Sequence, residues 1–163
     1  MESTVRGPAW RFLDLARRLE RAIALLGSVE AALGLAVEPL AFQPLAESLL
    51  SVNESLVAYR RRHRSDVEAD AAIALVIHDE SNPRSLVTAV ERLRRHAEDG
   101  AWGVGVDLAD EALATLSLPL HELLPAARAV IDRFGHAVVE RWFSSPVSPI
   151  LMRPTDEQTG VPA

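Results

Sequence analysis

The sequence contains no cysteine and no lysine, and only 5% of its residues are aromatic. Without cysteine there is no disulfide, no thiol nucleophile and no cysteine-ligated zinc. All seventeen basic residues are therefore arginine. This fits either a codon bias of the whole genome or selection for the planar, bidentate salt bridges that guanidinium groups form. The net charge of −6 argues against free nucleic acid as a partner.

Long apolar runs are also missing. No stretch approaches the roughly 20 apolar residues that a membrane-spanning helix needs. The first ten residues, MESTVRGPAW, contain no apolar signal region. We therefore expect a cytoplasmic protein with no membrane partner. Its 163 residues, 48% of them hydrophobic and 25% charged, match one ordinary globular domain.

What the sequence has in abundance is alanine and leucine, which favour helices over strands. Apolar residues recur at steps of three and four, the spacing of a helix with one buried face. The pattern predicts an all-α fold, a single bundle of about five to six mostly antiparallel helices. The expected helices cover residues 10–33, 44–64, 67–79, 83–98, 107–117 and 126–143. Pro119 and Pro125 are expected to limit regular helix before the last of them.

The two ends of the chain differ in composition from the middle. We expect residues 1–8 to form a flexible N-terminus and residues 9–143 to form the helical domain. Residues 144–163 contain four prolines and are expected to form a Pro-rich C-terminal tail.

The stretch HDESNPRS, residues 78–85, interrupts an apolar helical pattern with polar residues. Pro83 cannot donate a backbone hydrogen bond, which costs nothing at the first position of a helix. One interpretation is a turn, with a helix that begins at or next to Pro83 and has Ser81 or Asn82 as its N-cap. The other is a polar network, in which Asp79 and Arg84 reach Glu20, Arg21 or Arg60 from other helices.

The sequence contains none of the common catalytic or metal-binding motifs that are recognised by residue spacing. The five histidines show no paired metal-ligand spacing, there is no Glu-x-x-His pair, and no G-x-S-x-G elbow occurs. We therefore expect no metal and no cofactor, and the residues alone identify no catalytic group.

Three stretches together resemble the bacterial alpha-E family: WRFLDLARRLERAIALL (10–26), AYRRRHRSDVEADAAIALVIHDESNPRSL (58–86) and VVERWFSSPVSP (138–149). That family is all-helical, with a GR-x-x-ERA pattern in its first helix, a YR helix end and a D-x-x-NPRS turn. The matching positions here are Arg17, Glu20, Arg21, Tyr59, Arg60, Asp79, Asn82, Pro83, Arg84 and Ser85. Two positions depart from the pattern: Ala16 replaces a glycine, and His78 replaces an apolar residue.

The resemblance implies a context. Alpha-E domains occur fused to, or encoded beside, circularly permuted ATP-grasp proteins and transglutaminase-like proteins, in systems proposed to make or break amide bonds. The alpha-E part has no reaction firmly its own. Family members usually carry two copies of the motif set, and this chain looks like the second copy alone.

Two classes of function follow. In the first, the chain is a non-catalytic helical module that serves a peptide or amide ligase system. In the second, it is an enzyme or substrate-binding domain with a polar cleft formed by Glu20, Arg60, Asp79 and Arg84. In either case we expect Glu20, an arginine of residues 60–62, Asp79 and Arg84 to converge at one end of the bundle.

The pattern also predicts an oligomer. The apolar run at residues 71–77 and the aromatic pair Trp142 and Phe143 exceed what a small bundle covers by itself. A homodimer, or a complex with an ATP-grasp protein or another alpha-E protein, would supply the missing surface.

Overall fold

The computed structural model describes residues 8–35, 42–63 and 66–143, and these form seven α-helices and no strand. The predicted all-α class is therefore confirmed. The predicted flexible N-terminus, apart from Pro8, and the predicted C-terminal tail lie outside the described residues. The helices are α1 (Pro8–Leu35), α2 (Phe42–Val52), α3 (Leu56–Arg62), α4 (Ala69–Ile77), α5 (Leu86–Asp99), α6 (Gly103–Thr115) and α7 (Leu120–Phe143).

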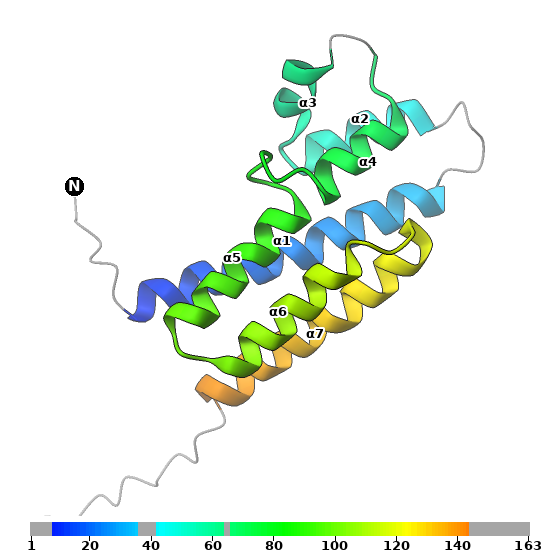
Figure 1. Ribbon diagram of the computed structural model, residues 1–163. Coiled ribbons are helices and arrows are strands. Elements are labelled where there is room, and N and C mark those ends of the chain that lie inside the picture. Colours follow the sequence, from blue (N-terminus) through cyan, green and yellow to red (C-terminus); the bar gives the residue numbers. More distant parts are fainter. Residues whose placement is uncertain (1–7, 36–41, 64–65, 144–163) are drawn as a thin grey trace, which may run out of the picture.

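Four long helices close into an antiparallel bundle. Helix α1 packs against α5 and α7, and α6 packs against the same two helices. Figure 1 shows that α1 and α6 run in one direction and that α5 and α7 return in the other. The short helices α2, α3 and α4 form a second group, which contacts the bundle through α1 and α5. The turn between α4 and α5 therefore lies where the two groups meet.

The core is built from the residue types that the composition suggested. Leu25 and Leu26 of α1, Leu93 of α5 and Phe134 of α7 are fully buried. The apolar run at residues 71–77 is covered by this chain itself, because all but two of its seven residues are buried. The expectation that this run needs a partner is therefore wrong.

The predicted helix at 44–64 is in fact two helices. Helix α2 ends at Val52 and α3 begins at Leu56. Between them Glu54 has a φ of 52°, the left-handed conformation that ends helices. The Asn53 side chain donates to the Leu49 carbonyl (2.9 Å) and to Ser28 Oγ on α1 (2.9 Å). Such bonds compete with helix continuation, and here they also anchor the break to the bundle.

The last two helices begin earlier than predicted. Helix α6 starts at Gly103 rather than 107, and α7 starts at Leu120 rather than 126, with Pro125 inside it. Proline in a helix removes the hydrogen bond to the carbonyl four residues before, here that of His121. Both residues are exposed, so water can bond this carbonyl and the helix continues.

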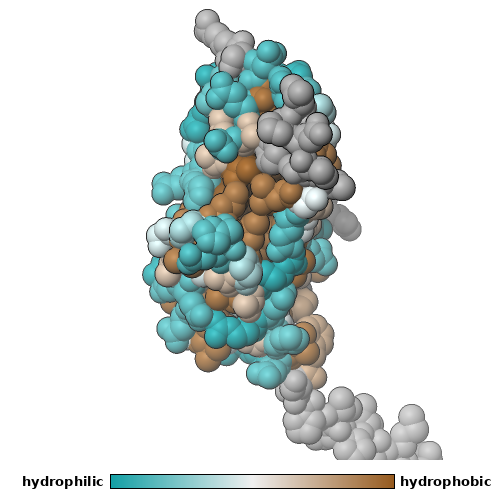
Figure 2. Space-filling model, turned by 90° about the vertical axis from the view of Figure 1, so that its right-hand side faces the viewer, coloured by the Kyte–Doolittle hydropathy of each residue, from teal (hydrophilic) through white to brown (hydrophobic). Residues whose placement is uncertain are grey.

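Large apolar side chains remain exposed at several places on the described part of the chain. At the end of α7, Val139, Trp142 and Phe143 are exposed, and the rings of Trp142 and Phe143 lie 5.8 and 5.5 Å from that of Phe12 on α1. Figure 2 shows an apolar strip surrounded by hydrophilic side chains on one face of the molecule. Within the described ranges, no helix combines the length and apolar character required to cross a membrane.

Candidate functional site

The 78–85 stretch is a hydrogen-bonded turn, and the helix after it begins later than predicted. Asp79 Oδ1 accepts from the Ser81 N–H (2.9 Å), and Asn82 Oδ1 accepts from the Arg84 N–H (3.1 Å). These side chains hold the backbone in a non-helical path through Pro83. Helix α5 therefore begins at Leu86, and neither Ser81 nor Asn82 is its N-cap.

Ser85 is the residue that caps α5. Its Oγ accepts from the Thr88 N–H (3.3 Å) and donates to Thr88 Oγ1 (3.0 Å). Both side chains are buried, so this bond satisfies one of the free N–H groups of the first helical turn. The matching position of the family motif thus has a structural explanation.

Asn82 is the buried centre of the turn, with 2% of its surface exposed. Its Nδ2 donates to Ser55 Oγ, just before α3 (3.0 Å), and to the Leu75 carbonyl in the last turn of α4 (3.1 Å). Asn82 therefore joins the beginning of α3, the end of α4 and the entry to α5.

Tyr59 has a comparable role in the second group of helices. It is fully buried, its ring stacks on His63 at 4.5 Å, and its hydroxyl accepts from the Glu68 N–H (2.9 Å). This bond fixes the entry to α4. Asn82, Ser85 and Tyr59 thus hold helix ends together.

The charged residues predicted to converge are divided between two surfaces. Arg62 binds Asp79 (2.5 Å) and Ser81 Oγ (2.7 Å), as the network interpretation expected for one arginine of residues 60–62. Arg60 instead pairs with Glu47 on α2 (2.9 Å) and is largely exposed.

Glu20 and Arg84 lie apart from the Arg62–Asp79 pair. They line a hollow beside α1. Arg84 binds Glu54, and Glu20 is exposed. The predicted single cluster of Glu20, Arg60–62, Asp79 and Arg84 is therefore wrong. The residues separate because the predicted second helix is split. The break places Glu54 next to Arg84, so these two residues form an ion pair, and Asp79 pairs with Arg62 instead.

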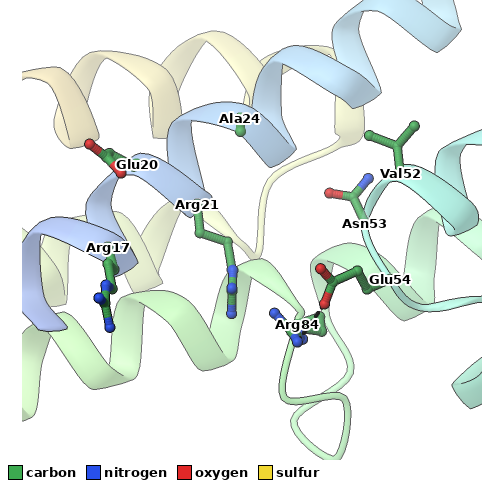
Figure 3. Close-up of a pocket in the computed structure, with 8 residues that line it drawn as sticks. All are labelled: Arg17, Glu20, Arg21, Ala24, Val52, Asn53, Glu54 and Arg84. Carbon is green, nitrogen blue, oxygen red and sulfur yellow. Dashed lines mark ion pairs between the residues drawn. The ribbon is translucent and has the colours of Figure 1, made fainter.

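A hollow of about 370 Å³ lies where α1 faces the α2–α3 break and the 78–85 turn. It is lined by Arg17, Glu20, Arg21, Ala24, Val52, Asn53, Glu54 and Arg84. Figure 3 shows Arg17 and Arg21 extending from α1 towards the side on which Arg84 lies, whereas the carboxylate of Glu20 points away from them. Four of the predicted site residues, Arg17, Glu20, Arg21 and Arg84, are thus brought together.

A second hollow, of about 410 Å³, adjoins the first, because Arg17, Arg21 and Arg84 line both. Its lining consists of Asp14, Arg17, Arg18, Arg21, Pro83, Arg84 and Arg92. We call the two hollows together the arginine groove. Five arginines line it against three carboxylates, those of Asp14, Glu20 and Glu54.

The arginines of the groove are close enough to affect one another. Burial lowers the pKa of Arg21, and the positive charges of Arg84 and Arg18 lower it further, while Glu54 partly opposes them. The guanidinium remains charged at neutral pH. Burial is the larger cause of the shift and the neighbouring like charges add to it, so Arg21 is a partly buried cation beside other cations, an arrangement typical of candidate binding sites.

Asp14 holds the end of the groove to the bundle. Its carboxylate pairs with Arg18 (3.2 Å) and with His96 Nε2 on α5 (2.7 Å). Burial acts to raise the pKa of Asp14, but the hydrogen bond to His96 and the charge of Arg18 outweigh it, so the pKa lies below its ordinary value of 3.8. The ionised form of Asp14 therefore stabilises the fold.

We expect this contribution to depend on pH. The lowered pKa means that it is complete above pH 3.8 and is lost as the pH falls through the folded-state pKa. Asp14→Asn should lower the free energy of unfolding by about 1 kcal/mol at pH 6, as for a partly exposed ion pair. Urea titrations at pH 6 and pH 3 should show the difference from the parent shrinking at the lower pH. Asp132→Asn, at an exposed position, is the control and should change little. A difference that grows towards pH 3 would contradict this reading of Asp14.

Four charged members of the groove were not predicted from the sequence: Asp14, Arg18, Glu54 and Arg92. Arg17, Arg18 and Arg21 are near enough in sequence to share one side of α1, which is a usable signal. Arg92 belongs to α5, and only the packing of α5 on α1 brings it to the groove. In the described part of the chain, no group of three histidines, aspartates or glutamates is placed to hold a metal ion.

Comparison with known proteins now adds a family. The model of the Alpha-E family, described as a predicted alpha-helical domain with a conserved ER motif, matches residues 1–143. The resemblance in sequence places that Glu-Arg pair at Glu20 and Arg21, and both residues line the arginine groove.

Curated relatives are much longer than this chain. Uncharacterised proteins of Mycobacterium bovis and of two strains of Mycobacterium tuberculosis are 38% identical to it over 98 residues. That alignment covers 60% of this chain and 11% of each relative, so the matched region is about a tenth of the relatives' length. No solved structure matches the chain.

Proposed function

The chain belongs to the Alpha-E family, and we propose that it acts as a non-catalytic helical module of an ATP-grasp system that forms peptide or amide bonds. The observation that carries the proposal is that its region of similarity makes up only 11% of each curated relative. In those proteins the domain is part of a larger chain, as a module of a multi-part system would be. Because such a system consumes ATP, the proposal places the chain in the cytoplasm.

The chemistry of the arginine groove supports the non-catalytic part of the proposal. Guanidinium groups stay protonated at neutral pH, so they bind and orient anions but do not serve as bases or nucleophiles. Three other residues of the family motif, Asn82, Ser85 and Tyr59, form bonds that hold helix ends. Of the three carboxylates in the groove, those of Asp14 and Glu54 are engaged in ion pairs and that of Glu20 points away from the arginines (Figure 3). The groove therefore suits binding better than acid–base catalysis.

Exposed apolar surface supports a protein partner. Phe143 is 65% exposed and Trp142 is 42% exposed, in a chain with few aromatic residues. Aromatic side chains are enriched in the cores of protein interfaces. We propose that this end of the bundle contacts an ATP-grasp protein or a second alpha-E domain, in another chain or in a homodimer.

Reconstitution tests the proposal. The purified chain is mixed with an ATP-grasp protein encoded beside it or in the same genome, and the complex is measured by light scattering coupled to gel filtration. Amide-bond formation is followed as ATP-dependent product release. We expect a complex, no turnover by this chain alone, and a rate for the ATP-grasp protein that depends on the chain.

Two variants sharpen this test. Phe143→Ser should weaken the complex about tenfold or more, as loss of an aromatic anchor does. Val57→Ser removes a similarly exposed apolar side chain from α3 and should leave the complex unchanged. Turnover by the isolated chain, or no effect on the ATP-grasp protein, would contradict the proposal.

A second candidate function is a substrate-binding domain. The cleft first considered for it, of Glu20, Arg60, Asp79 and Arg84, is not formed as such, because only Glu20 and Arg84 line the same hollow. The observation in its favour is that these two share the groove with Arg17 and Arg21. A substrate-binding function would therefore reside in the arginine groove.

A further inference from the structure

The arginine groove concentrates positive charge in an acidic protein. Its five arginines and three carboxylates leave two positive charges, whereas the whole chain has a net charge of −6. The excess therefore belongs to this one surface and is not a property of the whole chain. A local field of this kind attracts anions of small size.

Three of the guanidinium groups lack partners in the described part of the chain. Arg17, Arg21 and Arg92 make no ion pair and no side-chain hydrogen bond there, and Arg18 Nε is buried without an acceptor. Outside the groove, six described arginines pair with carboxylates, namely Arg60, Arg62, Arg94, Arg95, Arg128 and Arg133. Arg11 and Arg141 donate to backbone carbonyls, and only the exposed Arg61 is left without a bond among the described residues. The sequence has more acidic than basic residues, yet the guanidinium groups of Arg17, Arg21 and Arg92 in the groove have no acceptor in the part of the chain that the structure describes.

The arginine side chains reach the groove from several directions, which favours a tetrahedral anion as the ligand. Arg17 and Arg21 come from α1, Arg84 from the 78–85 turn and Arg92 from α5, so donors reach the groove from three elements. A guanidinium binds phosphate or carboxylate in a bidentate manner. A terminal phosphoryl group has three outward oxygens and up to two negative charges, which match donors from three elements and the excess of two positive charges. A carboxylate is planar and carries one charge.

We propose that the arginine groove binds a phosphoryl group, either as free phosphate or pyrophosphate or as the phosphate chain of a nucleotide. The two hollows, of about 370 and 410 Å³, have room for these groups. Arg17 and Arg21 of α1, Arg92 of α5 and Arg84 of the turn bind the anion directly. Glu54 holds Arg84 through their ion pair, and Asp14 holds Arg18, so two of the three acids each orient one arginine. This inference concerns the isolated chain and does not depend on the ligase system proposed above.

The test is calorimetric titration of the purified chain with pyrophosphate, in a buffer free of phosphate and sulfate. Arg21→Gln removes one donor at the centre of the groove and should weaken binding by about tenfold or more, as loss of a charged hydrogen bond does. Arg95→Gln is the matched control, because it removes the same charge from an exposed position on α5 outside the groove lining. We expect its dissociation constant to stay within about twofold of the parent, since distant exposed charges are screened.

Further arms identify the source of the phosphoryl group and keep the test decisive. Tighter binding of ATP than of pyrophosphate assigns the site to a nucleotide, and equal binding assigns it to the free anion.

Thermal melts should show that Arg21→Gln is folded and no less stable than the parent, because it relieves repulsion from Arg84 and Arg18. Arg92→Gln is the second variant, and it should weaken binding in the same way. No saturable binding, an equal loss in Arg95→Gln, or tighter binding of a triglutamate peptide than of pyrophosphate would overturn the proposal.

Discussion

Asn82→Ala is expected to lower the free energy of unfolding by about 3 kcal/mol, because each buried polar partner left unbonded costs about 1–3 kcal/mol. Asn82 Nδ2 serves both Ser55 Oγ and the Leu75 carbonyl, and Oδ1 holds the Arg84 N–H. No other described side chain donates to the Leu75 carbonyl. The substitution therefore loosens the junction of α3, α4 and α5.

Urea unfolding followed by circular dichroism measures the change in free energy, and thermal unfolding measures the change in melting temperature. For a domain of this size the loss should lower the melting temperature by roughly 6–12 °C, at about 2–4 °C per kcal/mol. Ser81→Ala is the neighbouring control, because it removes only an exposed hydrogen bond to Arg62 and should cost less than about 0.5 kcal/mol. A melting temperature of Asn82→Ala within a degree of the control would show that the turn does not hold the helices together.

Gly105→Ala is the second substitution with a large expected effect. A Cβ at this position would lie 2.2 Å from Cε3 of Trp102, far inside contact distance. The Trp102 ring is buried, with the Phe134 ring 5.1 Å away and the Trp142 ring 5.2 Å away, so it has little room to move. Overpacking of this kind costs about 1–3 kcal/mol, and we expect the upper part of that range.

The same helix supplies the matched control. At Gly103 an added Cβ meets no atom within 4 Å. Gly103→Ala should therefore be neutral or stabilise by up to about 1 kcal/mol, the gain from a better helix former. Chemical denaturation of both variants measures the contrast, and tryptophan emission should shift to longer wavelength only in Gly105→Ala. Equal stability of the two variants would show that the ring is not confined.

The sequence was sufficient for the fold class because helix periodicity is a local property. Helix ends were harder. Ser85 was not recognised as the cap of α5, because Ser81 and Asn82 are equally good capping residues and only the packed turn selects among them. The helix predicted to begin at residue 107 begins at Gly103, so Gly105 is inside α6 and makes room for the Trp102 ring.

The candidate site was predicted in part. Arg17, Glu20, Arg21 and Arg84 came from the family resemblance, and the structure brings them together. Arg92 and Glu54 could not be found in this way. The position of Arg92 depends on which face of α5 packs against α1. The position of Glu54 depends on a helix break, in which this residue has a positive φ. Both are consequences of tertiary packing, which periodicity does not encode.

Nuclear magnetic resonance of the arginine Nε–H groups tests whether the arginine groove is a functional surface of this chain. Pyrophosphate is added to the labelled chain and the shift of each assigned signal is followed. The account predicts saturable shifts confined to the five groove arginines, Arg17, Arg18, Arg21, Arg84 and Arg92, with Arg95 and Arg133 unchanged. Shifts spread evenly over all arginines, or none in the groove, would contradict it.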